Sequence, residues 1–439
     1  MKHKILHIIS YHATNICRMI LALVFVFSGF VKAVDPLGTT YKLEEYLMHW
    51  GLFDIPLSVC TGLAVMLSTL EFILGIYLLF GIRRKFTALA TFVFVSCMLL
   101  LTIYIVIAEP VADCGCFGDA IHLTNRETFV KNIFLFLASC MILRRPLFQF
   151  RFISERNQWL VSTYSFVYIL FFSTWSLYYL PVLDFRPYHI GVNIQEASQL
   201  PPSAKLPVYE TDFIFEKNGK QQHFKEENYP DSTWTFVDSK TKLISAGDEP
   251  KIKDFFISDL LTGDDVTDKL LADSLYAFWI ISPDLEEVED YPIDGINEIH
   301  DYCVDHGYSL YCITSSDHDA CVAWQDRIGV YFPILQADKT LLKTIVRSNP
   351  GLLLVKNGSI LNKWSKHDFP VEEQLNGDLE QMELVDDEYQ NRWFDLLKML
   401  SWYIIPLLFI TLADRIWIGS KYYKRYKLHK LILTNKKRQ

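Results

Sequence analysis

Residues 57–80 read LSVCTGLAVMLSTLEFILGIYLLF, a run of 24 residues in which Glu71 is the only charged side chain. A helix of about 20 apolar residues is long enough to cross the hydrocarbon core of a bilayer. A carboxylate inside such a helix is costly unless it is protonated or paired. This stretch therefore predicts a membrane protein in which Glu71 has a polar neighbour.

Five further apolar stretches extend this pattern through a chain of 439 residues that is 51% hydrophobic. The short fourth span contains Lys131, whose amine can reach the bilayer surface. The first span has no small-residue cleavage site after it, which predicts a retained helix rather than a signal peptide. The six predicted spans are Ile16–Val34, Leu57–Phe80, Phe86–Ala108, Thr128–Leu143, Trp159–Leu183 and Phe394–Leu412.

Charge predicts the orientation of these spans. Basic clusters precede the first span, separate the second from the third and the fourth from the fifth, and follow the last. Six spans place all four clusters on one side, which is the cytoplasm by the positive-inside rule. The opposite side then holds the expected loops Asp35–Pro56 and Glu109–Glu127. Residues 184–392 carry 39 Asp+Glu against 18 Lys+Arg. The sequence therefore predicts a bacterial inner-membrane protein with cytoplasmic termini and a large acidic periplasmic domain. The basic tail is expected to contact lipid headgroups rather than nucleic acid.

The predicted outer loop between the third and fourth spans contains Cys114-Gly115-Cys116. Cysteines one residue apart are close enough to bond, and Gly115 relieves part of the strain in so small a ring. A strained and exposed disulfide exchanges readily, which favours an electron carrier over a structural staple. Asp113 and Asp119 oppose thiolate formation, so the sequence predicts that neither thiol is a low-pKa nucleophile.

Other roles for these cysteines stay open. The pair can clamp the loop, or one thiol can bond to Cys60 at the outer end of the second span. A metal site has less support, because two thiolates need two further Cys or His ligands and only His122 is close in sequence. We expect no metal.

Three segments resemble the DoxX/MauE group of four-helix membrane proteins: Ser28–Pro36, Leu70–Gly75 and the loop Asp113–Asp119. The resemblance covers about residues 10–146. It implies electron transfer or disulfide maturation of exported proteins, with Cys114 and Cys116 as the redox pair. The architecture is also similar to that of quinone-coupled thiol oxidases, which implies a quinone acceptor and a second cysteine, Cys60, in the relay.

Two charges inside the predicted bundle fit this resemblance. Glu71 is expected to take the proton that accompanies reduction of a quinone. The alternative is a carboxyl that fixes packing, either protonated or paired with Lys32 near the outer end of the first span. Both interpretations stay open.

The acidic region begins with a β-rich stretch. Val208–Phe215 and Thr233–Val237 predict short strands, and Asn218-Gly219 is a hairpin turn signal. From about Pro250, strands alternate with helices, which predicts a mixed sheet with helices on both faces. The expected strands are Tyr276–Ser282, Tyr308–Thr314, Leu352–Val355 and Ser359–Trp364, and the expected helices are Ile296–Asp305, Asp317–Ile328 and Lys339–Val346.

This second part resembles a thioredoxin-like domain of the peroxiredoxin/TlpA kind. Asn349-Pro350 stands where that family has its cis-proline, which implies that an extended client peptide docks at these two residues. The Cys-x-x-Cys of the family is missing, because residues 282–287 read SPDLEE. We therefore expect no dithiol chemistry from this domain, and we expect Cys303, Cys312 and Cys321 to be buried free thiols.

The predicted fold is a membrane α-helical bundle, with four DoxX/MauE-like helices plus two further spans, and a soluble α/β thioredoxin-like domain. The predicted function is that of a thiol–disulfide oxidoreductase of the MauE/DoxX type, which exchanges electrons between periplasmic protein thiols or disulfides and a membrane acceptor. The alternative is a non-enzymatic membrane scaffold or assembly factor whose thioredoxin-like domain binds a partner. The expected parts are residues 1–150 (four-helix membrane domain), 151–185 (fifth transmembrane helix), 186–249 (β-rich appendage), 250–370 (thioredoxin-like domain), 371–393 (linker) and 394–439 (sixth helix and basic tail).

Overall fold

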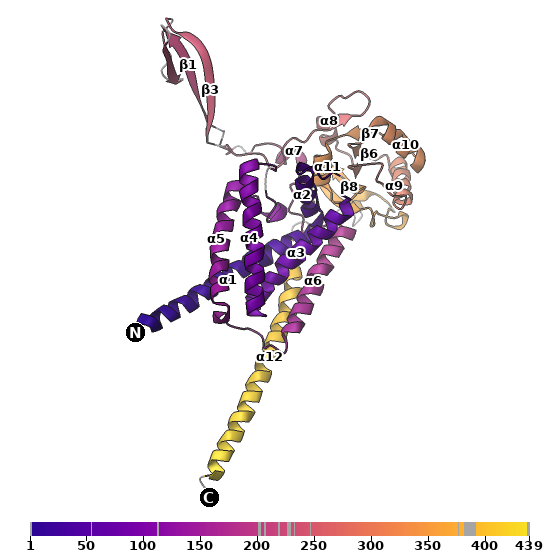
Figure 1. Cartoon of the computed structure of the whole chain (residues 1–439). Helices are drawn as coiled ribbons and strands as arrows, with labels where there is room; N and C mark the ends of the chain where they lie inside the picture. The colour runs from indigo at the N-terminus through magenta and orange to yellow at the C-terminus, as the bar shows by residue number, and fades with distance from the viewer. Residues whose placement is uncertain are drawn as a thin grey trace.

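The computed structural model shows a bundle of long helices, a sheet domain at one end of it and a small separate sheet (Figure 1). Five of the six predicted spans lie wholly within helices, and the fifth span in order, Trp159–Leu183, does so as far as Tyr178. The structure describes residues 2–53, 55–111, 114–200, 203–205, 208–217, 220–225, 230–231, 233–245, 247–375, 377–381 and 392–436.

Among the described residues, five helices are long and apolar enough to cross a membrane: α1, α3, α4, α6 and α12. The helix that contains the fourth predicted span, α5, is not among them. The helices of the bundle are α1 Lys2–Val34, α2 Pro36–His49, α3 Leu57–Phe80, α4 Arg84–Ala108, α5 Asn125–Arg144, α6 Gln158–Tyr178 and α12 Arg392–Lys436.

The low apolar content of α5 has a structural reason. Its polar side chains Asn132 and Ser139 are buried against the bundle, whereas Phe134 and Leu137 on the other face are 67% and 59% exposed. Its 20 residues correspond to about 30 Å of helix, the thickness of the hydrocarbon core. An apolar outer face of this length suits lipid contact, and a sixth crossing by α5 stays a prediction.

The closest helix packing in the bundle is between α1 and α3. A Cβ atom at Gly29 would lie 2.5 Å from the backbone nitrogen of Phe72, and one at Gly75 would lie 2.7 Å from that of Val26. Small residues let membrane helices approach at backbone distance. This approach carries α3 past the outer half of α1, which is the half that bears Ser28 and Lys32.

The expected outer loop Asp35–Pro56 is largely helical, which corrects the sequence analysis. Asp35 caps α2 by accepting a hydrogen bond from the Gly38 N–H, and Pro36 is the first residue of the helix. Both residue types are favoured at these positions. The predicted fifth span is also shorter than expected, because α6 ends at Tyr178 rather than at Leu183.

The six-stranded sheet has the order β4-β7-β6-β5-β8-β9, in which β5, β6 and β7 are parallel and β4, β8 and β9 run antiparallel to their neighbours. Its central strand β5 is buried along its whole length. The strands are β4 Ser258–Asp259, β5 Ala277–Ser282, β6 Ser309–Thr314, β7 Ile334–Gln336, β8 Gly351–Lys356 and β9 Ser359–Ser365, and the helices that accompany them are α7 Ile194–Ala197, α8 Thr267–Leu271, α9 Ile293–His306, α10 His318–Ile328 and α11 Lys339–Ile345. The three-residue strand β7 was not predicted from the sequence.

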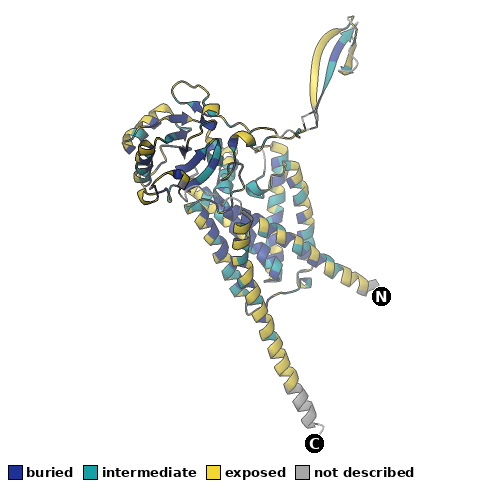
Figure 2. Cartoon of the chain, turned by 180° about the vertical axis from the view of Figure 1, so that it is seen from behind, coloured by how far each residue is buried: buried dark blue, intermediate teal, exposed yellow. Residues whose placement is uncertain are grey.

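The core of this sheet domain draws on residues outside 250–370. Tyr188 and Ile194 are buried in the cluster on one face of the sheet, and Leu375 and Leu379 in the cluster on the other. The domain therefore uses the first residues of the expected appendage and the start of the expected linker. Figure 2 shows the buried positions concentrated in this sheet and in the upper bundle, whereas the far part of α12 is exposed.

A three-stranded antiparallel sheet stands apart from the other two parts in Figure 1. Its order is β2-β1-β3, with β1 Val208–Lys217, β2 Lys220–Lys225 and β3 Thr235–Ser245. The β-rich stretch expected there is confirmed, although β3 extends well beyond Val237. The predicted turn Asn218-Gly219 lies outside the described residues.

The sheet domain contacts the bundle through charged and aromatic side chains. Arg347 bonds Asp35 at 2.9 Å and Asp119 at 3.0 Å. Lys343 bonds Glu44 of α2 at 3.2 Å. At the end of α6, the Tyr178 ring stacks on His367, with ring centroids 4.0 Å apart.

Candidate functional site

The cysteine loop joins α4 to α5 and folds back against α1 and α2. Gly115 and Gly118 have φ angles of +63° and +52°, in the left-handed region that glycine adopts without penalty. The loop turns tightly, because the Gly118 N–H donates to the Gly115 carbonyl at 3.1 Å. Side chains at these two positions would meet Lys42 and Val31 at 3.3 Å, so glycine also allows the close approach.

Cys114 and Cys116 are in contact and both are partly exposed, with their Sγ atoms 3.0 Å apart. The hydrogen bond from Cys114 lowers the pKa of Cys116 to about 6; burial opposes this shift, and the positive charges of Lys131 and Lys32 favour it. The same hydrogen bond, together with burial, raises the pKa of Cys114. The two thiols are therefore unequal, and Cys116 is the one that ionises first.

The expectation that this loop holds no low-pKa thiol is thus wrong for Cys116. Asp119 bonds Arg347 of the sheet domain, and burial raises the pKa of its carboxyl despite that partner. Asp113 lies outside the described residues. The lowered pKa of Cys116 was not predictable from the sequence, because Lys131 follows the loop on another helix and Lys32 precedes it by more than eighty residues.

Glu71 and Lys32 form a direct ion pair in the structure. Lys32 Nζ lies 2.7 Å and 2.9 Å from the two carboxylate oxygens, and both side chains are nearly inaccessible. Of the two alternatives for Glu71, pairing with Lys32 is therefore observed as a contact. Cys60 is also buried, in the first turn of α3. It is not among the described residues that line the cavities beside the cysteine pair.

A cavity of about 880 Å³ extends from the cysteine loop between the bundle and the sheet domain. Cys114, Cys116 and Lys32 line it, together with residues of both parts. Its apolar wall comes from α3 and α4 and includes Leu63, Leu67, Met98 and Leu101. The cavity therefore brings the two thiols, the lysine of the buried Lys32–Glu71 pair and an apolar helix surface to one place.

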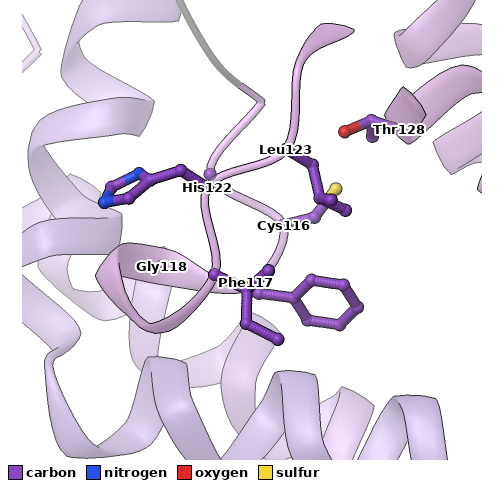
Figure 3. A pocket seen from close by; sticks show the side chains of 8 residues that line it. Cys116, Phe117, Gly118, His122, Leu123 and Thr128 are labelled. Atoms are coloured by element: carbon purple, nitrogen blue, oxygen red, sulfur yellow. The ribbon is translucent and has the colours of Figure 1, made fainter. Parts of the chain in front are cut away.

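A much smaller cavity, of about 10 Å³, lies on another side of Cys116. Figure 3 shows Cys116, Leu123 and Thr128 around it, with the ring of His122 directed away from the sulfur. The Thr128 hydroxyl is buried and has no hydrogen-bond partner among the described side chains and backbone. The volume of this small cavity is close to the minimum that one water molecule needs.

Arg347 is a site residue that the sequence analysis did not identify. It is 6% exposed and lies 312 positions from Asp35 in the chain. Burial acts to raise the pKa of Asp35, but Arg347 and Arg186 outweigh it, so this pKa is below its usual value. The only local signal was Asp35-Pro36, which marks a helix start; nothing in the sequence near Arg347 indicates its partners.

Asn349 and Pro350 are joined by a cis peptide bond just before β8. Pro350 is buried. The Asn349 side chain accepts a hydrogen bond from Ser282, the last residue of β5, at 2.7 Å and donates to the Asp284 carbonyl just beyond it at 2.8 Å. These bonds hold the loop before β8 against the end of β5. Peptide docking at Asn349 and Pro350 stays a prediction.

The sheet domain adds no second thiol pair to the site. Cys303, Cys312 and Cys321 are buried free thiols, and burial raises the pKa of each. This confirms their expected burial. Among the described residues, no group of three or more His, Cys, Asp or Glu side chains is arranged to hold a metal ion.

Comparisons with known proteins separate the parts of the chain. A comparison with curated proteins gives no match. The family model of a domain of unknown function, DUF8463, matches residues 209–246, which hold the three-stranded sheet. The family model of methylamine utilisation protein MauE matches residues 10–145, which confirms the MauE-like region expected over residues 10–146. With its five apolar helices, the chain is therefore a multi-pass membrane protein whose N-terminal region is similar to MauE.

Proposed function

We propose that the chain is a membrane thiol–disulfide exchange protein in which Cys114 and Cys116 carry the electrons. One observation carries the proposal: the two sulfurs touch at 3.0 Å and line a large cavity between the bundle and the sheet domain. When the pair closes to a disulfide, its two thiols give up two electrons and two protons. A client protein thiol or disulfide exchanges with the pair on one side of this cycle, and a membrane acceptor on the other.

The cavity fits a quinone as the membrane acceptor. Leu63, Leu67, Met98 and Leu101 would hold its apolar ring and tail, and Lys32 would face a ring oxygen. A quinone, when bound, supplies a sink for two electrons and two protons. The chain itself would contribute the two thiols, the apolar wall and the buried Lys32–Glu71 pair.

The sheet domain is proposed to be a thioredoxin-like domain without its own dithiol. The strand order β7-β6-β5-β8-β9 supports this assignment. Residues 282–287, which begin at the last residue of β5, stand where that family carries its cysteines and contain none. The domain would hold a client close to the bundle, which raises the effective concentration of client thiols at the cysteine loop.

The proposed location is a bacterial inner membrane, with both termini in the cytoplasm and the sheet domain in the periplasm. The basic clusters next to the spans support this orientation. The description of the matching family names methylamine utilisation. Exported proteins of such a process that carry thiols or disulfides are therefore one class of candidate client.

The test is thiol trapping in cells grown with and without a periplasmic oxidant. We expect Cys114 and Cys116 to change between the reduced and the oxidised form. We also expect the Cys114→Ser/Cys116→Ser double variant to change the disulfide content of periplasmic proteins. A Cys97→Ser/Cys140→Ser variant, which removes two cysteines of α4 and α5, is the matched control. A pair that stays in one redox state, with unchanged periplasmic disulfides in the double variant, refutes the proposal.

The second candidate function is a non-enzymatic scaffold or assembly factor. It is favoured by the Arg347 contacts, which tie the cysteine loop to the sheet domain as a structural joint would. For a scaffold, the double serine variant keeps full function and loses only stability. Removal of the sheet domain abolishes function in that case.

A further inference from the structure

Three polar side chains are buried in the bundle beneath the cysteine loop. Ser28 and Lys32 lie one helical turn apart on α1, and Glu71 faces them from α3. They are 6%, 5% and 3% exposed. Charges in this position are costly, and in membrane helices they mark functional sites more often than packing.

Close contacts join these three residues to the backbone of the loop. Lys32 Nζ bonds both oxygens of Glu71 and lies 3.2 Å from Ser28 Oγ. Ser28 Oγ lies 2.6 Å from Glu71 Oε2 and 2.7 Å from the Cys116 carbonyl oxygen. The hydroxyl has one proton, so it donates to one of these acceptors at a time. The ion pair is thereby connected to the loop at Cys116 itself.

The charged and titratable groups that face Cys116 come from three helices and from the loop. Lys32 and Lys131 favour the ionised form of both thiols, Glu71 opposes that of Cys116, and the hydrogen bond from Cys114 is what sets Cys116 apart. Lys131 is fixed by the neighbouring Phe117, with Nζ 4.3 Å from the ring centroid. Two positive charges against one negative charge leave a net positive environment.

We infer that Lys32 is a positioning residue for the proposed exchange, held by Glu71 and Ser28 so that its positive charge lies beneath the loop at Cys116 and stabilises Cys116 as the attacking thiolate. The inference rests on the proposed function and names the order in which the two thiols react. Cys114 keeps its proton and resolves the intermediate.

When the pair reduces a client, it starts as two thiols and ends as a disulfide. The Cys116 thiolate attacks a client disulfide, so that a Cys116–client bond forms and one client sulfur leaves as a thiolate and takes up a proton from water. Cys114 then loses its proton and attacks Cys116. The Cys114–Cys116 disulfide forms, and the second client sulfur leaves and is protonated. The reverse sequence oxidises a client dithiol and leaves the pair as two thiols, which can then pass two electrons and two protons to the proposed quinone acceptor.

The experiment measures how the alkylation rate of Cys116 depends on pH. The parent protein is the full chain with Cys114→Ser, because the serine hydroxyl can still donate a hydrogen bond to Cys116. The protein is purified in detergent, treated with iodoacetamide and analysed by peptide mass spectrometry. In Lys32→Met, we expect the midpoint to rise by about one pH unit or more, since a nearby opposite charge shifts a pKa by roughly 1–3 units. In Glu71→Gln, which keeps a polar side chain and removes the opposing charge, we expect the midpoint to fall.

Opposite shifts separate a charge effect from a packing effect, because loss of packing would disturb both variants in the same way. Lys32→Arg keeps the charge and should restore the midpoint. Lys339→Met is the matched control, since Lys339 lines the same large cavity but bonds Asp284 at 2.9 Å. Gel filtration reports whether each variant is folded. If Lys32→Met does not fold, Ser28→Ala tests the same contact and should give a smaller rise.

The inference is overturned if folded Lys32→Met and Glu71→Gln keep the parent midpoint or move it in the same direction. If Lys32→Met is not folded, an unchanged midpoint in Ser28→Ala overturns it. In either case, a cysteine pair that still changes its redox state in cells would leave the proposed function standing. A pair fixed in one state would refute the proposed function whatever the midpoints.

Discussion

Replacing Arg347 with Met should release the sheet domain and the cysteine loop from the bundle. The guanidinium is 6% exposed and lies 2.9 Å from Asp35 and 3.0 Å from Asp119. One close pair at this distance is worth about 6 kcal/mol at an effective dielectric constant of about 20, before the cost of desolvation. Methionine keeps most of the side-chain volume, so the change removes the charge and leaves two carboxylates without their partner.

The expected loss follows from what remains buried. Removing one partner of a buried ion pair costs about 3–5 kcal/mol. Most of this cost should come from Asp35, which is 14% exposed, rather than from Asp119, which is 33% exposed. Such a loss reduces the ratio of docked to undocked protein by on the order of 10²–10³-fold.

Hydrogen exchange of the full chain in detergent can measure this undocking. Amides of α2, α11 and the cysteine loop should exchange faster in Arg347→Met, whereas those of β5 in the sheet core should be unchanged. Lys343→Met removes a cation from the same interface, but its ion pair is partly exposed, so its loss should cost about 1 kcal/mol or less. Asp35→Asn should restore part of the protection in Arg347→Met, because it removes the unpaired charge. If the amides of α2 and the cysteine loop exchange as slowly in Arg347→Met as in the wild type, the reasoning is refuted.

Three further predictions follow from single contacts. Gly29→Ala should destabilise the bundle by about 1–3 kcal/mol, since its Cβ would lie 2.5 Å from the α3 backbone, whereas Gly62→Ala, which meets nothing within 4 Å, should not; thermal unfolding in detergent compares the two. Alkylation of Cys116 in the reduced wild-type protein should have its midpoint near pH 6, with the thiolate present above and lost below that pH; peptide mass spectrometry would contradict this if the midpoint lay at the ordinary thiol value. Asp414→Ala should cost about 1.5–3 kcal/mol, because this buried carboxylate accepts hydrogen bonds from the Ser154 N–H and hydroxyl ahead of α6; an unchanged melting temperature would count against it.

The sequence alone determined the parts of this protein that depend on local pattern. Long apolar runs such as residues 57–80 specify helices, because an apolar helix satisfies its own backbone groups wherever it lies. The alternation in residues 276–364 and the order of its strands and helices were also predictable. So was the cysteine pair, whose two residues are neighbours in the chain.

Features with weak local signals were harder to predict. Helix α2 was expected to be a loop, although Asp35-Pro36 marks its start, because its sequence is mixed rather than apolar. Strand β7 has three residues, too few for a pattern. The polar inner face of α5 made its hydropathy a poor guide, because buried Asn132 bonds Thr102 of α4 and buried Ser139 bonds the Phe136 carbonyl of its own helix.

Only the tertiary structure decided the chemistry around the cysteine pair. The acidic residues near it in the sequence predicted that neither thiol has a low pKa. The fold instead bonds Asp119 to Arg347 and brings Lys32 and Lys131 to Cys116 from two different helices. Coulomb interactions depend on distance in space and on burial, not on separation along the chain. For that reason the sequence could identify the two thiols, whereas the folded chain determined which of them ionises.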